Sequence, residues 1–477
     1  MHAITTRIIE THEKALRINL EPMRYGTFAE IGAGQEVVRW FFRVGGAAGT
    51  IAKSMSAYDM AVSDAVYGAT ERYVSRARLE AMLDHEHELN RQRLFESRGA
   101  TTAFFAFADT VAAKSYRGAS ECHGWMGVKF QSQPRDRDSR ILIHVRMLDR
   151  DASAQQEALG IVGVNLLYGA CFHHHEPELL VESLLDGLGT HRIEIDMIEF
   201  SGIEFRRVDN RLMSMKLVEL GLSGAAMFGP NGEVLQPSEA LYKKHVLLAR
   251  GSFRPVCFSH VDILRSARER FTGDLGDLAS QPITELAELT LRNLRGDRTE
   301  VDRSDFLARA DTLAAVGKTV LVSDYTEFHR LAGYVARTTK QRSAFVIGAG
   351  TLQEIFDERS YASLEGGILE AVGKLFRNDL VLYVYPLRNP ETGELTTAHN
   401  FAANPRLRGL YDHLVAVGSI RQLENYDARY LPIFSRDVLA KITRGDPSFR
   451  EQVPGEVARV IRERGIFGWR EPLPRAG

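Results

Sequence analysis

The chain has 477 residues, of which 44% are apolar, 26% charged and 9% aromatic, and its 60 Lys and Arg nearly balance 62 Asp and Glu. This apolar content excludes a chain that stays unfolded, because disordered segments lack the hydrophobic residues that offset the entropy of ordering. A formal charge of -2 excludes nucleic-acid binding through bulk charge. The length allows two or three domains, or one large α/β domain with an extension.

The sequence predicts a protein of the reducing cytoplasm. Its longest apolar runs, such as residues 161–172, hold about 12 residues and fall short of the roughly 20 that cross a bilayer. Residues 1–14 carry several charges and no apolar stretch typical of a signal peptide. Cys122, Cys171 and Cys257 lie far apart in the chain, which argues against a zinc ribbon or a disulfide framework.

Residues 1–139 are expected to form a mixed, mostly helical N-terminal segment. The charged loop at 133–138 marks its expected boundary with the next domain. Its predicted elements are an apolar helix over 35–44, a glycine-rich stretch at 45–49, an amphipathic helix over 71–97, and β-like runs over 103–111 and 126–131.

In residues 140–417, short β-branched runs alternate with segments of helical period, which predicts an α/β domain with parallel strands and helical crossovers. Eight strands in about 280 residues suit a (β/α)8-barrel-like domain or an open doubly wound sheet. Residues 418–477 are expected to form a C-terminal extension. The predicted strands span 141–148, 161–168, 192–200, 225–228, 256–260, 319–324, 344–348 and 380–385, and the predicted helices 152–159, 178–188, 210–220, 238–248, 261–271, 284–293, 303–316, 325–338, 351–376 and 405–416.

The stretch from Gly45 to Ser54 superficially resembles a phosphate loop. A P-loop places its Lys directly after the last Gly, so that backbone N–H groups and the ammonium converge on the phosphates. Here three residues separate Gly49 from Lys53, which argues against a P-loop. A close helix-packing turn and an anion-binding turn remain open, and Lys53 is kept as a candidate substrate-binding residue.

Polar residues near the ends of the predicted strands are the main site candidates, because α/β folds bind ligands at the carboxyl ends of their strands. The candidates are Asp196, Glu199 and His260 for catalysis, Arg146, Asn165, His123 and Lys53 for substrate binding, and Asp196, Glu199 and Asp262 as metal ligands. Carboxylate oxygens suit Mg²⁺ or Mn²⁺, while capping of a helix is the alternative role for Asp262. His260 would transfer a proton, and Arg146 would bind an anion.

Two histidine-containing stretches have competing interpretations. Consecutive residues in an extended segment point apart, so at most two side chains of His173-His174-His175-Glu176 would share an ion, and a solvated loop before a helix is predicted instead. His123 lies beside Trp125, where imidazole and indole would either line a pocket for a planar ligand or pack in a turn.

Four blocks carry a family resemblance, namely 34–50, 123–127, 163–170 and 364–370. They resemble an uncharacterised family of bacterial proteins of similar length, which are labelled either nicotinate-nucleotide adenylyltransferase or TonB-dependent receptor. The resemblance implies a cytosolic protein of one long architecture with nucleotide or nicotinate chemistry, and it transfers no functional residue. The sequence lacks the His-x-Gly-His motif of such adenylyltransferases, and it lacks the signal peptide and many alternating strands of an outer-membrane receptor.

The sequence therefore predicts a cytosolic enzyme, a transferase or hydrolase, that binds an anionic, phosphorylated or nucleotide-like small molecule at the carboxyl ends of parallel strands, with or without a divalent metal. Two alternatives remain open. One is a non-catalytic scaffold or assembly protein, and the other is a regulator that binds a nucleotide without turning it over. The expected partners are a small molecule and further copies of the chain, and neither nucleic acid nor a membrane is expected.

Overall fold

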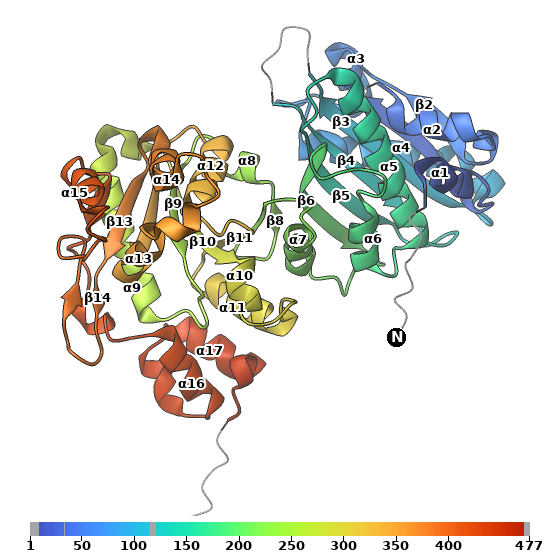
Figure 1. The fold of residues 1–477 in the computed structure, drawn as a ribbon. Helices are drawn as coiled ribbons and strands as arrows, with labels where there is room; N and C mark the ends of the chain where they lie inside the picture. Colours follow the sequence, from blue (N-terminus) through green and yellow to red (C-terminus); the bar gives the residue numbers. More distant parts are fainter. Residues whose placement is uncertain (1–8, 33, 115–120, 472–477) are drawn as a thin grey trace, which may run out of the picture. The chain divides into compact units, whose positions relative to one another are not determined.

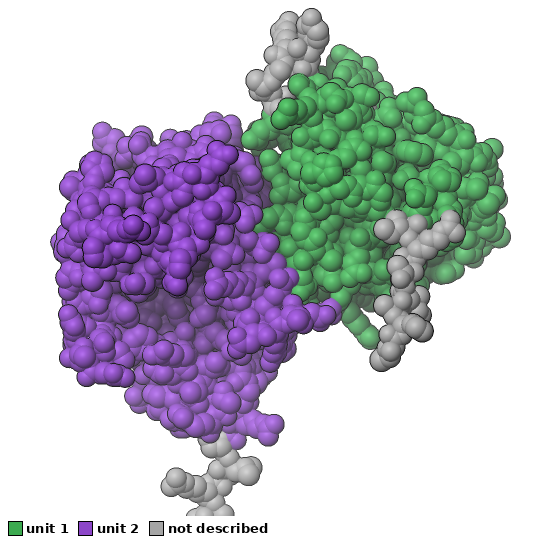
Figure 2. Space-filling model, in the orientation of Figure 1, with its two compact units in different colours: residues 1–224 green, residues 225–477 purple. Residues whose placement is uncertain are grey.

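The computed structural model describes residues 9–32, 34–114 and 121–471 and divides into two compact units, residues 1–224 and 225–477 (Figure 1, Figure 2). Residues 1–8, 33, 115–120 and 472–477, which belong to the expected terminal segments, lie outside the described residues. No helix of the described part is long and apolar enough to cross a membrane.

The division into units differs from the boundaries expected from the sequence. The strands on either side of residue 139 pair with one another, so the expected boundary falls inside the sheet of unit 1. Residue 418 lies inside unit 2, because the strand that begins at Ile420 pairs with the strand that begins at Val381. Charged loops of this kind connect strands of one sheet as readily as they connect domains.

Unit 1 is built on a six-stranded sheet in the order β2-β1-β3-β4-β5-β6. β2, β1 and β3 are parallel, whereas β3 to β6 form an antiparallel meander. Residues 1–139, which were expected to be mostly helical, thus contain the four strands β1 to β4 as well as helices. The strands are β1 (Arg24–Ile31), β2 (Ile51–Met55), β3 (Ala103–Ala112), β4 (His123–Phe130), β5 (Ser139–Met147) and β6 (Ile193–Gly202).

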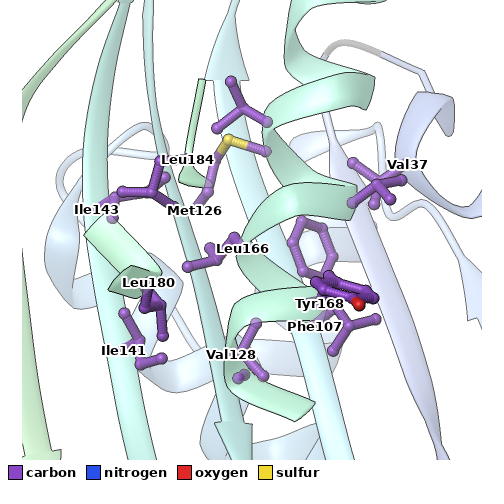
Figure 3. Close-up of a cluster of buried hydrophobic side chains, with 14 of the residues drawn as sticks. Val37, Phe107, Met126, Val128, Ile141, Ile143, Leu166, Tyr168, Leu180 and Leu184 are labelled. Atoms are coloured by element: carbon purple, nitrogen blue, oxygen red, sulfur yellow. The ribbon is translucent and has the colours of Figure 1, made fainter. Parts of the chain in front are cut away.

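Helices cover both faces of this sheet. One face packs against α4, which contacts β1, β3 and β4, and the other carries α5 with α1 and α2 beside it (Figure 1). Figure 3 shows the core of that second face, where Leu166 of α5 lies among side chains of β4 and β5. The helices are α1 (Thr11–Asn19), α2 (Glu36–Val44), α3 (Met60–Tyr67), α4 (Arg76–Arg98), α5 (Ala152–Phe172), α6 (Pro177–Ser183) and α7 (Asn210–Glu219).

The run 161–168, predicted as a strand, lies inside the helix α5. The helix begins at Ala152, where the Asp151 side chain accepts a hydrogen bond from the Ala154 N–H and so caps its first turn. Most of its side chains are buried, because it runs between the sheet and neighbouring helices. A helix that is buried on most sides is apolar around most of its circumference and loses its amphipathic period, so a stretch such as 161–168 resembles a buried strand in sequence.

Unit 2 contains an eight-stranded sheet in the order β16-β13-β12-β9-β10-β11-β7-β8. The six strands from β16 to β11 are parallel, while β7 and β8 pair antiparallel at one side. In the described residues the sheet is open, so the doubly wound arrangement forms and the barrel does not. The strands are β7 (Ala225–Phe228), β8 (Val234–Leu235), β9 (His245–Arg250), β10 (Ile283–Thr290), β11 (Thr319–Ser323), β12 (Ser343–Gly348), β13 (Val381–Tyr385) and β16 (Ile420–Gln422), and β14 (Leu387–Arg388) pairs separately with β15 (Leu395–Thr396).

The helices of unit 2 also lie on both faces of its sheet (Figure 1). α12, α14 and α15 share one apolar core with strand residues such as Leu248 and Val384. α9 lies on the opposite face, where the ring of Phe271 contacts that of Tyr383. The helices are α8 (Pro237–Ala240), α9 (Phe258–Leu275), α10 (Leu291–Arg295), α11 (Arg303–Ala315), α12 (Phe328–Thr338), α13 (Leu352–Ile355), α14 (Gly367–Leu375), α15 (Arg408–Ala416), α16 (Ser435–Thr443) and α17 (Gly455–Arg464).

Three predicted elements of unit 2 are wrong, and they adjoin the site described below. The predicted helix 238–248 contains the start of β9, and the predicted helix 284–293 is mostly β10. The predicted strand 256–260 is a turn followed by the start of α9. In β10, apolar residues at 283, 286, 287 and 289 mimic helical spacing, because a strand buried on both faces need not alternate.

Candidate functional site

The strand order of unit 2 reverses beside β9. The chain forms β9, β10 and β11 in one direction and then returns to the other side of β9 with β12, β13 and β16. Because these six strands are parallel, their carboxyl ends lie at one edge of the sheet. Open α/β sheets bind their ligands at such a reversal, outside the carboxyl ends of the strands. The fold therefore places the candidate site at this edge.

The turn from β9 to α9 lies directly at the reversal. It comprises residues 251–257 and ends at Cys257, the N-cap of α9. The Cys257 N–H donates a hydrogen bond to Nδ1 of His260 at 3.0 Å, so the imidazole satisfies a backbone donor of the turn. Burial lowers the pKa of His260 to about 4 and raises that of the Cys257 thiol to about 12. Both side chains are therefore neutral near pH 7.

A cavity of about 560 Å³ lies next to the carboxyl end of β9, where this turn begins. It is lined by residues at the carboxyl ends of β9 and β10, by the loop before α12, and by the segment after β12. Arg250, the last residue of β9, forms part of its wall. Arg250 Nε and Nη2 donate to the Glu288 carboxylate at 2.7 and 2.9 Å, and its Nη1 and Nη2 donate to the carbonyls of Thr326 and Tyr325.

A second cavity of about 680 Å³ is lined by Ser252 of the same turn. Its other walls are β14 with Arg388, the loop that follows β14, and the start of α16, residues 434–436. The hydroxyls of Ser252 and Ser435 lie 3.4 Å apart. No side chain caps the N-terminus of α16, so its first N–H groups lack side-chain acceptors, and the exposed guanidinium groups of Arg388 and Arg436 add positive charge.

The β9–α9 turn is a part of the site that the prediction missed. Residues 257–260 read Cys-Phe-Ser-His and match His-x-Gly-His only at His260, so that motif is absent here too. The segment follows the first parallel strand of the sheet and begins a helix. The assignment of residues 245–248 to a helix hid this context. An apolar strand followed by Gly251 and a helix start would have revealed it.

Asp262, predicted as a metal ligand or a helix cap, lies one turn inside α9 and is buried. Its Oδ2 accepts hydrogen bonds from the Tyr385 hydroxyl at 2.8 Å and the Asp427 N–H at 2.9 Å, and its Oδ1 accepts from Arg265 at 2.6 Å. The carboxylate therefore joins α9 to β13 and to the loop that contains Asp427.

In unit 1, the predicted residues Asp196 and His123 are connected through His144, which was not predicted. Asp196 Oδ1 on β6 lies 2.6 Å from Nδ1 of His144 on β5, and Nε2 of His144 lies 3.0 Å from Nδ1 of His123 on β4. The three side chains thus form a hydrogen-bonded chain across three neighbouring antiparallel strands. The prediction named Asp196 and His123 but not His144. The antiparallel register of β4, β5 and β6, which aligns the three residues, is not readable from one sequence.

The remaining charged candidates of unit 1 are held in ion pairs. Arg146 pairs with Glu194 across β5 and β6. Glu199 accepts two hydrogen bonds from Arg76, at 2.7 and 2.8 Å.

Lys53 lies on β2, at the opposite edge of the sheet from β6. Its Nζ lies 2.5 Å from the buried carboxylate of Glu86 on α4. The structure therefore does not bring Lys53 to the chain of Asp196, His144 and His123.

Asn165, predicted to bind substrate, is fully buried in α5. Its amide nitrogen donates to the carbonyls of Leu184 and Asp186, and its oxygen accepts a hydrogen bond from Lys14 Nζ at 2.8 Å. Lys14 also pairs with the Asp186 carboxylate at 2.6 Å. These contacts tie α1 and the loop after α6 to α5, which accounts for a buried amide without a ligand.

A pair of buried carboxylates lies at the carboxyl ends of β1 and β3. Glu30 and Asp109 are register neighbours, and each is 2% exposed. The Glu30 oxygens accept the N–H groups of Val37 and Val38 at 2.9 Å, so the side chain caps α2 from a neighbouring strand. Burial raises the pKa of Glu30 to about 7, and burial together with the nearby Glu30 raises the pKa of Asp109.

No protein-family profile and no curated protein matches the sequence. Among solved structures, the chain is similar to the competence/damage inducible protein CihA from Agrobacterium tumefaciens, with 14% identity over 34% of this chain and 97% of that chain and a TM-score of 0.25. It is also similar to the nicotinic acid mononucleotide adenylyltransferase of Plasmodium falciparum, with 10% identity over 48% of this chain and 98% of that chain and a TM-score of 0.30. TM-scores this low carry no argument about fold or activity.

Proposed function

We propose that unit 2 binds a phosphorylated, nucleotide-like small molecule at the carboxyl edge of its parallel sheet. The observation that carries this proposal is the reversal of strand order beside β9, with one cavity lined by Arg250 at the end of that strand and another lined by Ser252 in the turn that follows it. This strand order and ligand position are those of doubly wound nucleotide-binding folds in general. The cavities, of about 560 and 680 Å³, lie within the size range of small-molecule sites.

The cavity beside Ser252 is the better place for the phosphate groups. Two exposed guanidinium groups, those of Arg388 and Arg436, border it, and the start of α16 offers backbone N–H groups. Arginine binds phosphate oxygens through paired N–H groups, and a helix N-terminus favours negative charge. In the other cavity, Arg250 is already engaged by Glu288, and three carboxylates, those of Glu327, Glu354 and Asp357, outnumber the one further guanidinium, that of Arg292. The cavity beside Ser252 has two guanidinium groups and one carboxylate, that of Glu391. The cavity beside Arg250 suits an uncharged or hydroxyl-rich part of a ligand.

Titration calorimetry of the full chain with ATP, with and without Mg²⁺, tests this proposal. The double variant Arg388→Glu with Arg436→Glu is expected to weaken ATP binding at least about tenfold, because each lost phosphate contact is worth about 1.5–3 kcal/mol. Both side chains are exposed, so the variant should fold normally.

A control variant with the same change in charge is Arg298→Glu with Arg429→Glu, whose side chains are exposed in the same unit and lie outside both cavities. It should bind ATP as the original protein does. The proposal fails if the original protein shows neither heat of binding nor a rise in melting temperature with ATP. It also fails if the control variant loses as much affinity as the test variant.

The hydrogen-bonded chain in unit 1 favours a second candidate function, general base catalysis at His123. In the tautomer of His144 that donates from Nδ1 to Asp196, Nε2 is the acceptor for the N–H of His123 Nδ1. His123 then keeps a free electron pair on Nε2. Burial and the neighbouring His144 lower the pKa of His123 to about 4, so the ring is unprotonated near pH 7. A carboxylate that orients an imidazole is a common device for producing a base, and here Asp196 acts on His123 through the second imidazole of His144.

The rate at which diethyl pyrocarbonate modifies His123, measured by peptide mass spectrometry, tests this second candidate. Asp196→Asn is expected to slow modification of His123 several-fold, because an amide no longer fixes the His144 tautomer that accepts the His123 proton. Exposed His191 provides the internal reference and should react at an unchanged rate. Equal slowing at both histidines, or no change at His123, would contradict this role.

A further inference from the structure

Three side chains of unit 1, two adjacent in sequence and one about 30 residues further along, gather beyond the end of α5. His174 and His175 lie in the turn between α5 and α6, and Glu204 lies in the loop after β6. One ligand atom of each residue, an imidazole nitrogen or a carboxylate oxygen, lies within 4.8 Å of the other two. This is the one group of three or more His, Cys, Asp or Glu side chains in the described ranges that is spaced to hold a metal ion.

His174 is the residue that most needs a partner. Its side chain is only 5% exposed, yet neither ring nitrogen makes a hydrogen bond of good geometry. The Ala170 carbonyl interacts weakly with the ring. Leaving a buried polar group without a partner costs about 1–3 kcal/mol, so such groups are rare in folded proteins. An N–H directed at the Ala170 carbonyl would leave the electron pair of the second nitrogen for a ligand.

Glu204 is already oriented toward the two imidazoles. Its backbone N–H donates to the Ser139 hydroxyl at 3.0 Å, which fixes the start of the loop. The Ser132 hydroxyl donates to Glu204 Oε1 at 2.7 Å, and Oε2 lies 4.0 Å from Nδ1 of His175. Hydrogen bonds of this kind to one carboxylate oxygen are typical partners of metal ligands, because they hold the other oxygen in place.

We infer that His174, His175 and Glu204 bind a divalent transition metal, with Zn²⁺ as the best match. Two imidazoles and one carboxylate form a donor set of zinc sites, whereas Mg²⁺ and Ca²⁺ prefer oxygen ligands alone. Metal–ligand bonds near 2.1 Å place tetrahedral donors roughly 3.4 Å apart, so small side-chain rotations suffice to close the observed spacing. Three protein ligands leave a fourth position for water or a small anion.

The site differs from the magnesium or manganese site expected from Asp196, Glu199 and Asp262. Two of its ligands, His174 and His175, belong to the histidine run for which a solvated loop was predicted. The third, Glu204, lies in a loop about 30 residues further along the chain. A bound ion would join the end of α5 to the loop after β6. The charge of nearby Arg24, which acts on His174, opposes a cation, so we expect micromolar rather than much tighter affinity.

Titration of the full chain, prepared without a polyhistidine tag and freed of metal by chelation, tests the site. The probes are Zn²⁺ by calorimetry and Co²⁺ by its visible absorption, which reports coordination by nitrogen and oxygen. One equivalent is expected to bind. His175→Ala and Glu204→Gln change side chains that are not buried, so both variants should fold, and each is expected to weaken Zn²⁺ binding at least about tenfold.

His173→Ala is the matched control, because His173 adjoins the site in sequence but is not one of the three ligands. It should bind Zn²⁺ as the original protein does. His174→Leu should abolish binding without loss of melting temperature, because it removes a buried group that lacks partners in the metal-free protein. The inference is overturned if the original protein binds no Zn²⁺, if the ligand variants bind it unchanged, or if His173→Ala loses binding equally.

Discussion

Replacing Glu288 by alanine is expected to destabilise unit 2 by about 3–5 kcal/mol. Glu288 lies on β10 with its side chain fully buried, and it accepts two hydrogen bonds from Arg250 and one, at 2.5 Å, from the Ser323 hydroxyl. Without it, a largely buried guanidinium would keep its charge and lose its counter-ion. An unpaired buried charge costs far more than the pair contributes when it is intact.

Differential scanning calorimetry measures this effect, because the two units should give separable transitions. Glu288→Ala should lower the transition of unit 2 alone. Glu269→Ala, which removes an exposed carboxylate on α9 that also pairs with an arginine, should leave it nearly unchanged. The double variant Glu288→Leu with Arg250→Met should recover much of the loss, since apolar groups of similar size replace both charges. If Glu288→Ala behaves as Glu269→Ala does, the buried pair has no such role.

The stability of unit 1 is expected to fall by about 2.5 kcal/mol between pH 5 and pH 8 through Glu30. The pKa of Glu30 is about 7 in the folded protein, against 4.5 for an unperturbed glutamate, and each pH unit of difference corresponds to about 1.4 kcal/mol. Between these two values the folded state binds more protons than the unfolded state. Stability therefore decreases as the pH rises through this window and levels off above it.

Urea unfolding of unit 1 at pH 5, 6, 7 and 8 measures this slope for the original protein and for Glu30→Gln. The variant has no carboxyl group to ionise at this position. As the pH rises, Glu30→Gln should therefore become more stable relative to the original protein. Glu88→Gln, an exposed change on α4, should keep the original slope. A difference between original and Glu30→Gln that stays constant from pH 5 to pH 8 would show that Glu30 does not titrate in this range.

Much of the fold could be predicted from the sequence where local signals agree. β11 and β12 are short β-branched runs, and Gly317 lies between α11 and β11 as a helix stop with a positive φ. The failures concern buried elements. The segment that forms most of α5 is apolar without a clear period, and the apolar residues of β10 happen to follow helical spacing. Neighbouring layers bury both elements on two sides, and periodicity cannot then separate helix from strand.

The candidate site was harder to predict than the fold. Site residues were predicted at the ends of strands whose pairing, parallel or antiparallel, could not be known from the sequence. Asp196 and Arg146 were predicted for this reason, although they lie on antiparallel strands of unit 1. The reversal beside β9 depends on strand order, which long-range pairing determines. The grouping of His174, His175 and Glu204 likewise depends on where a turn and a distant loop meet.

The contact of Lys14 with Asn165 and Asp186 has a practical consequence for shortening the protein. Trimming the first twenty residues would remove the ammonium from α1 and leave an amide oxygen and a carboxylate facing the space it vacated. Terminal segments usually tolerate deletion when their backbone and side chains are exposed, but α1 has buried side chains, including Lys14, Ala15 and Ile18, and packs against α5. A truncated protein that begins after α1 should therefore aggregate or be degraded more readily than one that keeps the helix.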